Sequence, residues 1–196
     1  MSAEPGPDGR LRCPWALAAP DYLDYHDGEW GRPVRTVAGL YERMSLEGFQ
    51  SGLSWLTILR KRDHFRRAFA GFDPVRVAAF DDADVERLLA DAGIVRNRAK
   101  IEAAISNARV VAGLGQAYAD LVWSFAVADR PRPASLAEVP ATTPESVALA
   151  AALRRTGIRF VGPTTAYALM QAVGLVDDHL ADCVVEVPQR RRVSDR

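Results

Sequence analysis

Four side chains of the types that bind zinc lie near the two ends of this 196-residue chain. Cys13 and His26 lie near the N-terminus, and His179 and Cys183 lie near the C-terminus. Because His179 and Cys183 are four residues apart, one helical turn would place both on the same face. Two thiolates and two imidazoles form a closed tetrahedral set, which is typical of structural zinc and leaves no position for an activated water. A chance grouping of these four residues is the alternative.

A second candidate site is the turn between two predicted helices at residues 159–166, with the sequence RFVGPTTA. Gly162 permits a positive φ there, and Pro163 can begin the second helix. Such a turn leaves unpaired N–H groups at a helix N-terminus, where they can bind a phosphate of DNA. We therefore expect Val161, Gly162, Pro163 and Thr164 to contact a DNA backbone, although an ordinary helix connection would have a similar sequence.

Helical periodicity dominates the segments that must position these residues. Apolar residues follow the 3–4 spacing of a buried stripe at 37–44, and similar stripes recur along most of the chain. Thr36, Ser54 and Thr143 occupy expected N-cap positions. Alternating strand patterns are nearly absent, so we predict an all-α fold. We expect a flexible tail at 1–12, one helical domain at 13–187 and a basic C-terminal tail at 188–196.

Composition and charge narrow the class of protein. Hydrophobic residues make up 48% of the chain, enough for a sizeable core, and we find neither a membrane-spanning run nor a secretory leader. We therefore expect a cytoplasmic, monomeric protein. Lys plus Arg and Asp plus Glu number 25 each, and this balance argues against nucleic-acid binding. Basic residues do cluster at 60–67 and 96–100, as they would in a DNA contact or a solvated helix face.

Several blocks of sequence, in order from Cys13 to Cys183, resemble the DNA-3-methyladenine glycosylase I family, a branch of the helix-hairpin-helix DNA glycosylase superfamily. The blocks are Arg12-Cys13-x-Trp15, Tyr25-His26-Asp27-x-Glu29-Trp30-Gly31, Leu46-Glu47-Gly48-x-Gln50-x-Gly52-Leu53-Ser54-Trp55, Asp91-Ala92-Gly93-Ile94, Val122-Trp123-Ser124-Phe125, Phe160-Val161-Gly162 and Asp178-His179-x-x-x-Cys183. The resemblance implies a helix-hairpin-helix glycosylase-like domain. It also implies one structural Zn²⁺ that joins the N- and C-terminal segments, bound by Cys13, His26, His179 and Cys183.

The resemblance further implies a base excision repair enzyme that hydrolyses the N-glycosidic bond of 3-methyladenine in alkylated double-stranded DNA. The superfamily hairpin pattern G-V-G-x-K-T-A includes a lysine that forms a Schiff base in strand-cleaving members. Thr164 stands in that place and cannot form one, so we expect a monofunctional enzyme that leaves an abasic site. The usual superfamily aspartate falls near Asp177 and Asp178, and we expect Asp178 to orient His179 instead.

A base pocket follows from the same resemblance. It places the substrate-binding residues at Tyr25, Glu47 and Trp55, with Trp15 and Trp30 on the same wall. 3-Methyladenine in DNA is cationic, and an indole face attracts a cation. Glu47 can accept hydrogen bonds from the adenine edge, and we also expect it to be the catalytic residue.

Two alternatives remain open. The chain could be a non-catalytic zinc-containing module that holds only the DNA backbone, or a glycosylase for another lesion. Glu47 beside an aromatic pocket separates the first alternative from an enzyme, because a backbone clamp needs no cavity shaped for a base.

Overall fold

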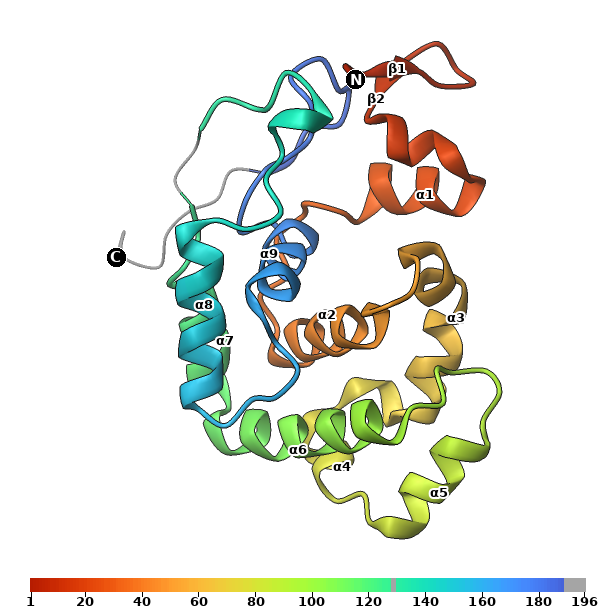
Figure 1. The fold of residues 1–196 in the computed structure, drawn as a ribbon, viewed down its shortest axis with the longest axis vertical. Coiled ribbons are helices and arrows are strands. Elements are labelled where there is room, and N and C mark those ends of the chain that lie inside the picture. The colour runs from red at the N-terminus through yellow and green to blue at the C-terminus, as the bar shows by residue number, and fades with distance from the viewer. Residues whose placement is uncertain (128–129, 189–196) are drawn as a thin grey trace.

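The computed structural model describes residues 1–127 and 130–188, and nine α-helices form most of this part of the chain (Figure 1). The helices are α1 (Pro20–Gly28), α2 (Val37–Gln50), α3 (Trp55–Ala68), α4 (Pro74–Ala78), α5 (Asp82–Ala90), α6 (Arg98–Leu114), α7 (Gln116–Trp123), α8 (Pro144–Arg155) and α9 (Pro163–Ala172). The shorter elements are strands β1 (Glu4–Pro5) and β2 (Leu11–Arg12) and the 3-10 helices η1 (Pro14–Ala18), η2 (Ala70–Phe72) and η3 (Leu136–Glu138). The mostly helical architecture confirms the prediction. Within the described residues, no helix combines the length and apolar character needed to cross a bilayer.

Side-chain caps set the starts of the helices that position the site. The Thr36 hydroxyl caps α2 by accepting a hydrogen bond from the Gly39 amide at 3.2 Å. The Ser54 hydroxyl caps α3 in the same way, accepting from the Thr57 amide at 3.3 Å. Thr143 forms a reciprocal capping box at the start of α8. Each cap stabilises its helix by about 1 kcal/mol, and the three predicted N-caps are confirmed.

The core surrounds α2, which packs against α3, α6, α7 and α9 near the centre of the molecule (Figure 1). Leu40, Tyr41 and Met44 on α2 are almost completely buried. The Tyr41 hydroxyl donates a hydrogen bond to the Ala104 carbonyl of α6 at 2.9 Å, which satisfies its buried polar atom. Glu47 also lies on the buried surface of α2. The burial of its carboxyl requires a separate explanation.

The N-terminal segment, where the sequence predicts a flexible tail at residues 1–12, contains a short hairpin. Strand β1 pairs antiparallel with β2, and the Val184 amide of the C-terminal segment donates to the Leu11 carbonyl at 2.8 Å. Arg12, only 3% exposed, forms salt bridges with Asp8 at 2.6 Å and Asp27 at 2.8 Å. The long-range contacts with Asp27 and Val184 fix the position of a segment whose local composition is typical of a loop. All but the first residue of the predicted tail at 188–196 lies outside the described residues.

Candidate functional site

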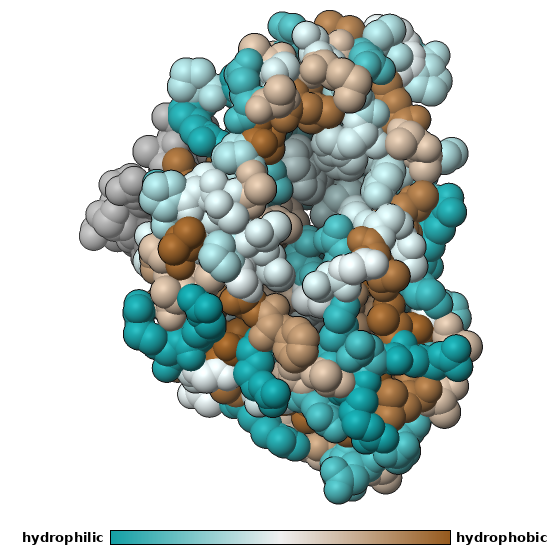
Figure 2. Space-filling model, in the orientation of Figure 1, coloured by the Kyte–Doolittle hydropathy of each residue, from teal (hydrophilic) through white to brown (hydrophobic). Residues whose placement is uncertain are grey.

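A cavity of about 350 Å³ opens among α1, α2, α3 and α9. Figure 2 shows the surface hollowed in this part of the molecule, below the N-terminal segment. All five residues expected to bind the substrate line this one cavity, although they are spread along the sequence from Trp15 to Trp55. The cavity is lined by Trp15, Tyr22, Tyr25, Trp30, Glu47, Gln50, Trp55, Leu136, Val139, Ala168, Gln171 and Asp178.

Aromatic rings form much of the cavity wall. The rings of Tyr25 and Trp55 lie 5.5 Å apart between centroids and are tilted by 45°, and Trp15 meets Trp30 edge to face at 5.1 Å. Trp55 is half-buried, and its indole N–H finds no hydrogen-bond partner among the described residues. A cavity with such walls can hold a planar ring, and the indole faces favour a cationic one.

The Glu47 carboxyl is buried in this cavity without a hydrogen bond to any described residue. Its residue is 7% exposed. Burial raises the pKa of Glu47 to about 8, and the nearby positive charge of Arg43 opposes this shift only in part. A buried polar group without a partner destabilises the fold. The position of Glu47 is therefore explained by a ligand that would bind it.

The basic cluster at 60–67 forms ion pairs within the protein. Arg62 donates two hydrogen bonds to the Glu29 carboxylate at 2.6 and 2.7 Å, which ties α3 to the end of α1. Arg66 donates to Glu42 of α2 at 2.8 Å. Much of this charge therefore holds together the three helices around the cavity. Neither a solvated helix face nor a DNA contact fully describes the cluster.

Two neighbouring carboxylates have different roles from those predicted. Asp177 orients His179, because its Oδ1 lies 2.8 Å from Nδ1 of the imidazole and also accepts the His179 amide at 3.1 Å. Asp178 lines the cavity instead and accepts a hydrogen bond from Gln171 at 2.8 Å. The prediction that Asp178 orients His179 is therefore wrong. The segment is irregular, so helical periodicity could not indicate which side each residue faces.

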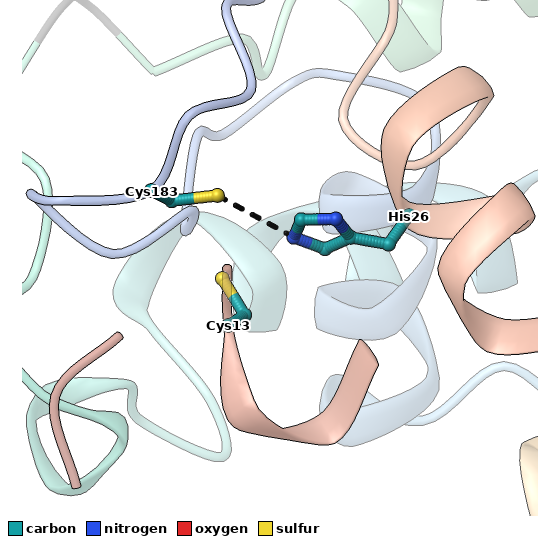
Figure 3. A group of neighbouring side chains, drawn as sticks. All are labelled: Cys13, His26 and Cys183. Atoms are coloured by element: carbon teal, nitrogen blue, oxygen red, sulfur yellow. Dashed lines mark hydrogen bonds between the residues drawn. The ribbon is translucent and has the colours of Figure 1, made fainter. Parts of the chain in front are cut away.

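Cys13, His26 and Cys183 come together near the cavity, from widely separated parts of the chain (Figure 3). One donor atom from each lies within 4.8 Å of the others, and Sγ of Cys183 is 3.6 Å from Nε2 of His26. All three residues are buried. His179 lies beside this group, with its ring centroid 5.0 Å from that of His26. Three of the four predicted ligands thus form one cluster, and the fourth is its neighbour.

Each of the two imidazoles has a carboxylate partner at Nδ1. Nδ1 of His26 lies 2.8 Å from Asp27, just as Nδ1 of His179 lies 2.8 Å from Asp177. Carboxylate–imidazole pairs of this kind orient the ligands of protein-bound zinc. Nε2 of His179 is buried and has no hydrogen-bond partner among the described residues. A buried nitrogen without a partner, next to the His26 imidazole, has the chemistry of a metal ligand.

The helical turn predicted to hold His179 and Cys183 does not form. Helix α9 ends at Ala172, and the described residues after it contain no helix. A local turn, in which the Cys183 amide donates to the Leu180 carbonyl at 2.9 Å, brings Cys183 toward the cluster. His179 and Cys183 therefore lie near each other because of this turn, and not because they share a face of a helix.

The predicted hairpin is the connection between α8 and α9, two helices that pack together. Gly162 is the N-cap of α9, but its φ of −92° contradicts the predicted positive φ. The left-handed positions are Gly157 and Phe160, with φ of 99° and 59°. A Cβ at Gly162 would meet no described atom within 4 Å, and no side chain caps α9. The backbone at the start of α9 is thus open to a partner.

Comparisons with known proteins agree with this geometry. Residues 15–186 match the family model described as methyladenine glycosylase. DNA-3-methyladenine glycosylase 1 of Escherichia coli (strain K12) is 48% identical over 178 residues, which cover 88% of this chain and 95% of that protein. A crystal structure of 3-methyladenine DNA glycosylase I matches with a TM-score of 0.85 and 48% identity, over 88% of this chain and 98% of the other.

A more distant match is a structure of 3-methyladenine DNA glycosylase I from Staphylococcus aureus. That structure concerns the structural basis of 3-methyladenine recognition by the enzyme. It matches with a TM-score of 0.83 and 32% identity, over 88% of this chain and 95% of the other. From the family model, the sequence identity and the shared fold together, the chain belongs to the methyladenine glycosylase family.

Proposed function

We propose that this protein is a DNA repair glycosylase that hydrolyses the N-glycosidic bond of 3-methyladenine in alkylated double-stranded DNA. The observation that carries the proposal is the largely buried Glu47, whose carboxyl lines an aromatic cavity and has no hydrogen bond to any described residue. The cavity volume of about 350 Å³ falls within the range of small-molecule sites, about 300–1,000 Å³. The 3-methyladenine bound by relatives of this chain fits both the chemistry and the size.

Recognition of the base rests on stacking and charge. A base inside a duplex must be extruded before a pocket can contain it. The extruded base stacks on Trp55 and Tyr25, and its positive charge faces the indole ring and the Glu47 carboxylate. Glu47 also accepts hydrogen bonds from the amino edge of the adenine ring. A cation in the cavity stabilises the ionised form of Glu47, which burial disfavours in the free protein.

The reaction breaks the bond between C1′ of the sugar and N9 of the base. The bonding electron pair passes to the ring and neutralises its positive charge, while a water oxygen adds to C1′ and releases a proton to solvent. Because the departing base is neutral and leaves readily, correct geometry supplies much of the catalysis, and Glu47 contributes by holding the extruded base at its amino edge. Glu47 is therefore the catalytic residue of this proposal.

The product is an abasic site in an intact strand. Thr164 replaces the Schiff-base lysine of strand-cleaving relatives. The chain has only two lysines, Lys61 and Lys100. The Lys61 ammonium donates to the Ala92 carbonyl at 2.8 Å and the Lys100 ammonium to the Ser51 carbonyl at 2.6 Å. Neither lysine lines the cavity, which supports a monofunctional enzyme.

The hairpin between α8 and α9 is proposed as the DNA-backbone contact. No side chain of the described residues caps the first turn of α9, so its N–H groups are available to a phosphate. Arg154, in the last turn of α8, and Arg159, on the connection, are exposed and line a surface depression with Gly162 and Thr165. Two positive charges beside an open helix N-terminus favour an anionic backbone.

A structural Zn²⁺ is proposed for the cluster of Cys13, His26, His179 and Cys183. The orphaned Nε2 of His179 and the mutual proximity of the other three side chains support this ligand set. When bound, the ion would cross-link the N- and C-terminal segments, and its four protein ligands would leave it without a catalytic role. The residues of this cluster then stabilise the wall of the cavity formed by Trp15 and Trp30, which contact the two imidazoles.

Intrinsic fluorescence can test the proposal, because Trp15, Trp30 and Trp55 line the cavity. Free 3-methyladenine should quench this fluorescence saturably, whereas adenine should bind more weakly. Incubation with methylated duplex DNA should also produce alkali-labile sites. A protein that only clamps the DNA backbone would bind the duplex without either effect, and that result would overturn the proposal.

A further inference from the structure

Gln171 lines the base cavity from α9, and its amide has a fixed orientation. Its Nε2 donates a hydrogen bond to Oδ2 of Asp178 at 2.8 Å. An ionised carboxylate can only accept hydrogen bonds, so the NH₂ end of the amide must face Asp178. The carbonyl end of Gln171 receives no hydrogen bond from any described residue, and it remains available as an acceptor.

Asp178 is itself held rigidly. Its side chain is fully buried, and its Oδ1 accepts from the Arg130 guanidinium at 2.6 Å. Its Oδ2 also accepts from the Tyr167 hydroxyl at 2.6 Å. The three donors together prevent its carboxylate from rotating. The orientation of Gln171 is thus determined by a network that lies behind the cavity wall.

We infer that Gln171, oriented by Asp178, is a second hydrogen-bond acceptor in the base pocket and selects a purine that carries an exocyclic amino group. This inference rests on the proposed function and adds a specificity-determining residue to it. An amino group has two N–H donors, so Glu47 and Gln171 can each accept one. A 6-oxo purine would place its oxygen against these acceptors, and the unpaired polar groups would oppose its binding.

The substitution Asp178→Asn tests this orientation directly. The new amide would keep its carbonyl oxygen toward Arg130 and turn its NH₂ toward Gln171. Gln171 would then have to rotate, so that its own NH₂ would face the cavity. We expect the affinity for free 3-methyladenine to fall by roughly tenfold to a hundredfold, as measured by fluorescence titration.

A second substitution in the same protein should restore binding. In the Asp178→Asn background, Gln171→Glu supplies a carboxylate that accepts from the new amide and still presents an oxygen to the cavity. The double variant should recover most of the lost affinity. Gln50→Glu in the same background is the matched control. Gln50 also lines the cavity, but it forms no hydrogen bond to Asp178 in the described part of the chain. Equal recovery with the control would show that only charge matters, which would overturn the inference.

Gln171→Met covers the case in which Asp178→Asn fails to fold. Methionine nearly keeps the shape of the side chain and removes its acceptor. The ratio of affinities for 3-methyladenine and its 6-oxo counterpart, 3-methylhypoxanthine, should fall at least roughly tenfold. An unchanged ratio in a folded variant overturns the inference. If the unmodified protein binds no 3-methyladenine, the proposed function fails instead, so the two failures are distinguishable.

Discussion

Glu47→Gln should make the protein more stable and less active, and the gain in stability should depend on pH. In the folded protein, burial raises the pKa of the Glu47 carboxyl from its ordinary value of 4.5 to about 8. Between these values the folded protein holds one proton more than the unfolded chain. The free energy of unfolding therefore falls as the pH rises through this window. Glutamine does not titrate, so the variant escapes this loss.

The size of the effect follows from the pKa shift. Each unit of pKa difference corresponds to about 1.4 kcal/mol. Between about pH 5 and pH 8 the contribution of Glu47 to the free energy of unfolding should thus decrease by about 4 kcal/mol. Activity should change in the opposite direction. A hydrogen bond to a charged group contributes about 1.5–3 kcal/mol, so excision should slow by roughly tenfold to a hundredfold.

Urea denaturation of both proteins at several pH values provides the measurement. The difference in free energy of unfolding between variant and parent should be small near pH 5 and should widen toward pH 8. Glu145→Gln, at an exposed position on α8, controls for the loss of a glutamate charge. If the difference between Glu47→Gln and the parent does not change with pH, or if excision is unaffected, our interpretation of Glu47 is wrong.

Three further predictions address the metal, the pocket and the product. Elemental analysis should find about one zinc per chain, and Cys183→Ser should lower both zinc content and melting temperature; a folded, active protein without metal would contradict the site. Trp55→Ala should weaken binding of free 3-methyladenine. Phe65→Ala should lower the free energy of unfolding by about 3–5 kcal/mol, because Phe65 is fully buried. Trp55→Ala should lower it less, because Trp55 is half-buried. Unchanged affinity with a collapsed melting temperature would make Trp55 a core residue. Borohydride should trap no adduct with DNA, because Thr164 cannot form a Schiff base; a trapped adduct would refute monofunctional chemistry.

Local sequence patterns predicted much of the fold, and the family resemblance predicted which residues line the cavity. Helical periodicity and N-caps such as Thr36 and Ser54 are local properties, so they could be identified without a structure. Tyr25, Glu47 and Trp55 could be grouped only through the family resemblance, because they come from three different helices. The structure brings them together, and their individual roles stay predictions.

Other features depended on contacts that no local pattern contains. The order of the N-terminal hairpin comes from the ion pair between Arg12 and Asp27, fifteen residues away. Asp177 and Asp178 lie in an irregular segment, where no periodicity indicates which carboxylate faces the histidine. The sequence alone does not indicate Gln171 as a pocket residue, because its role depends on the hydrogen bond from its amide to Asp178. In each case a long-range contact determines the role of the residue.

The base that the protein releases from alkylated DNA identifies its activity most directly. Duplex DNA treated with a methylating agent contains several methylated bases, and mass spectrometry of the soluble fraction can distinguish them. We expect 3-methyladenine to appear rapidly with this protein and to be released much more slowly by Glu47→Gln. Release of no base, or of another methylated base in its place, would contradict the proposed function.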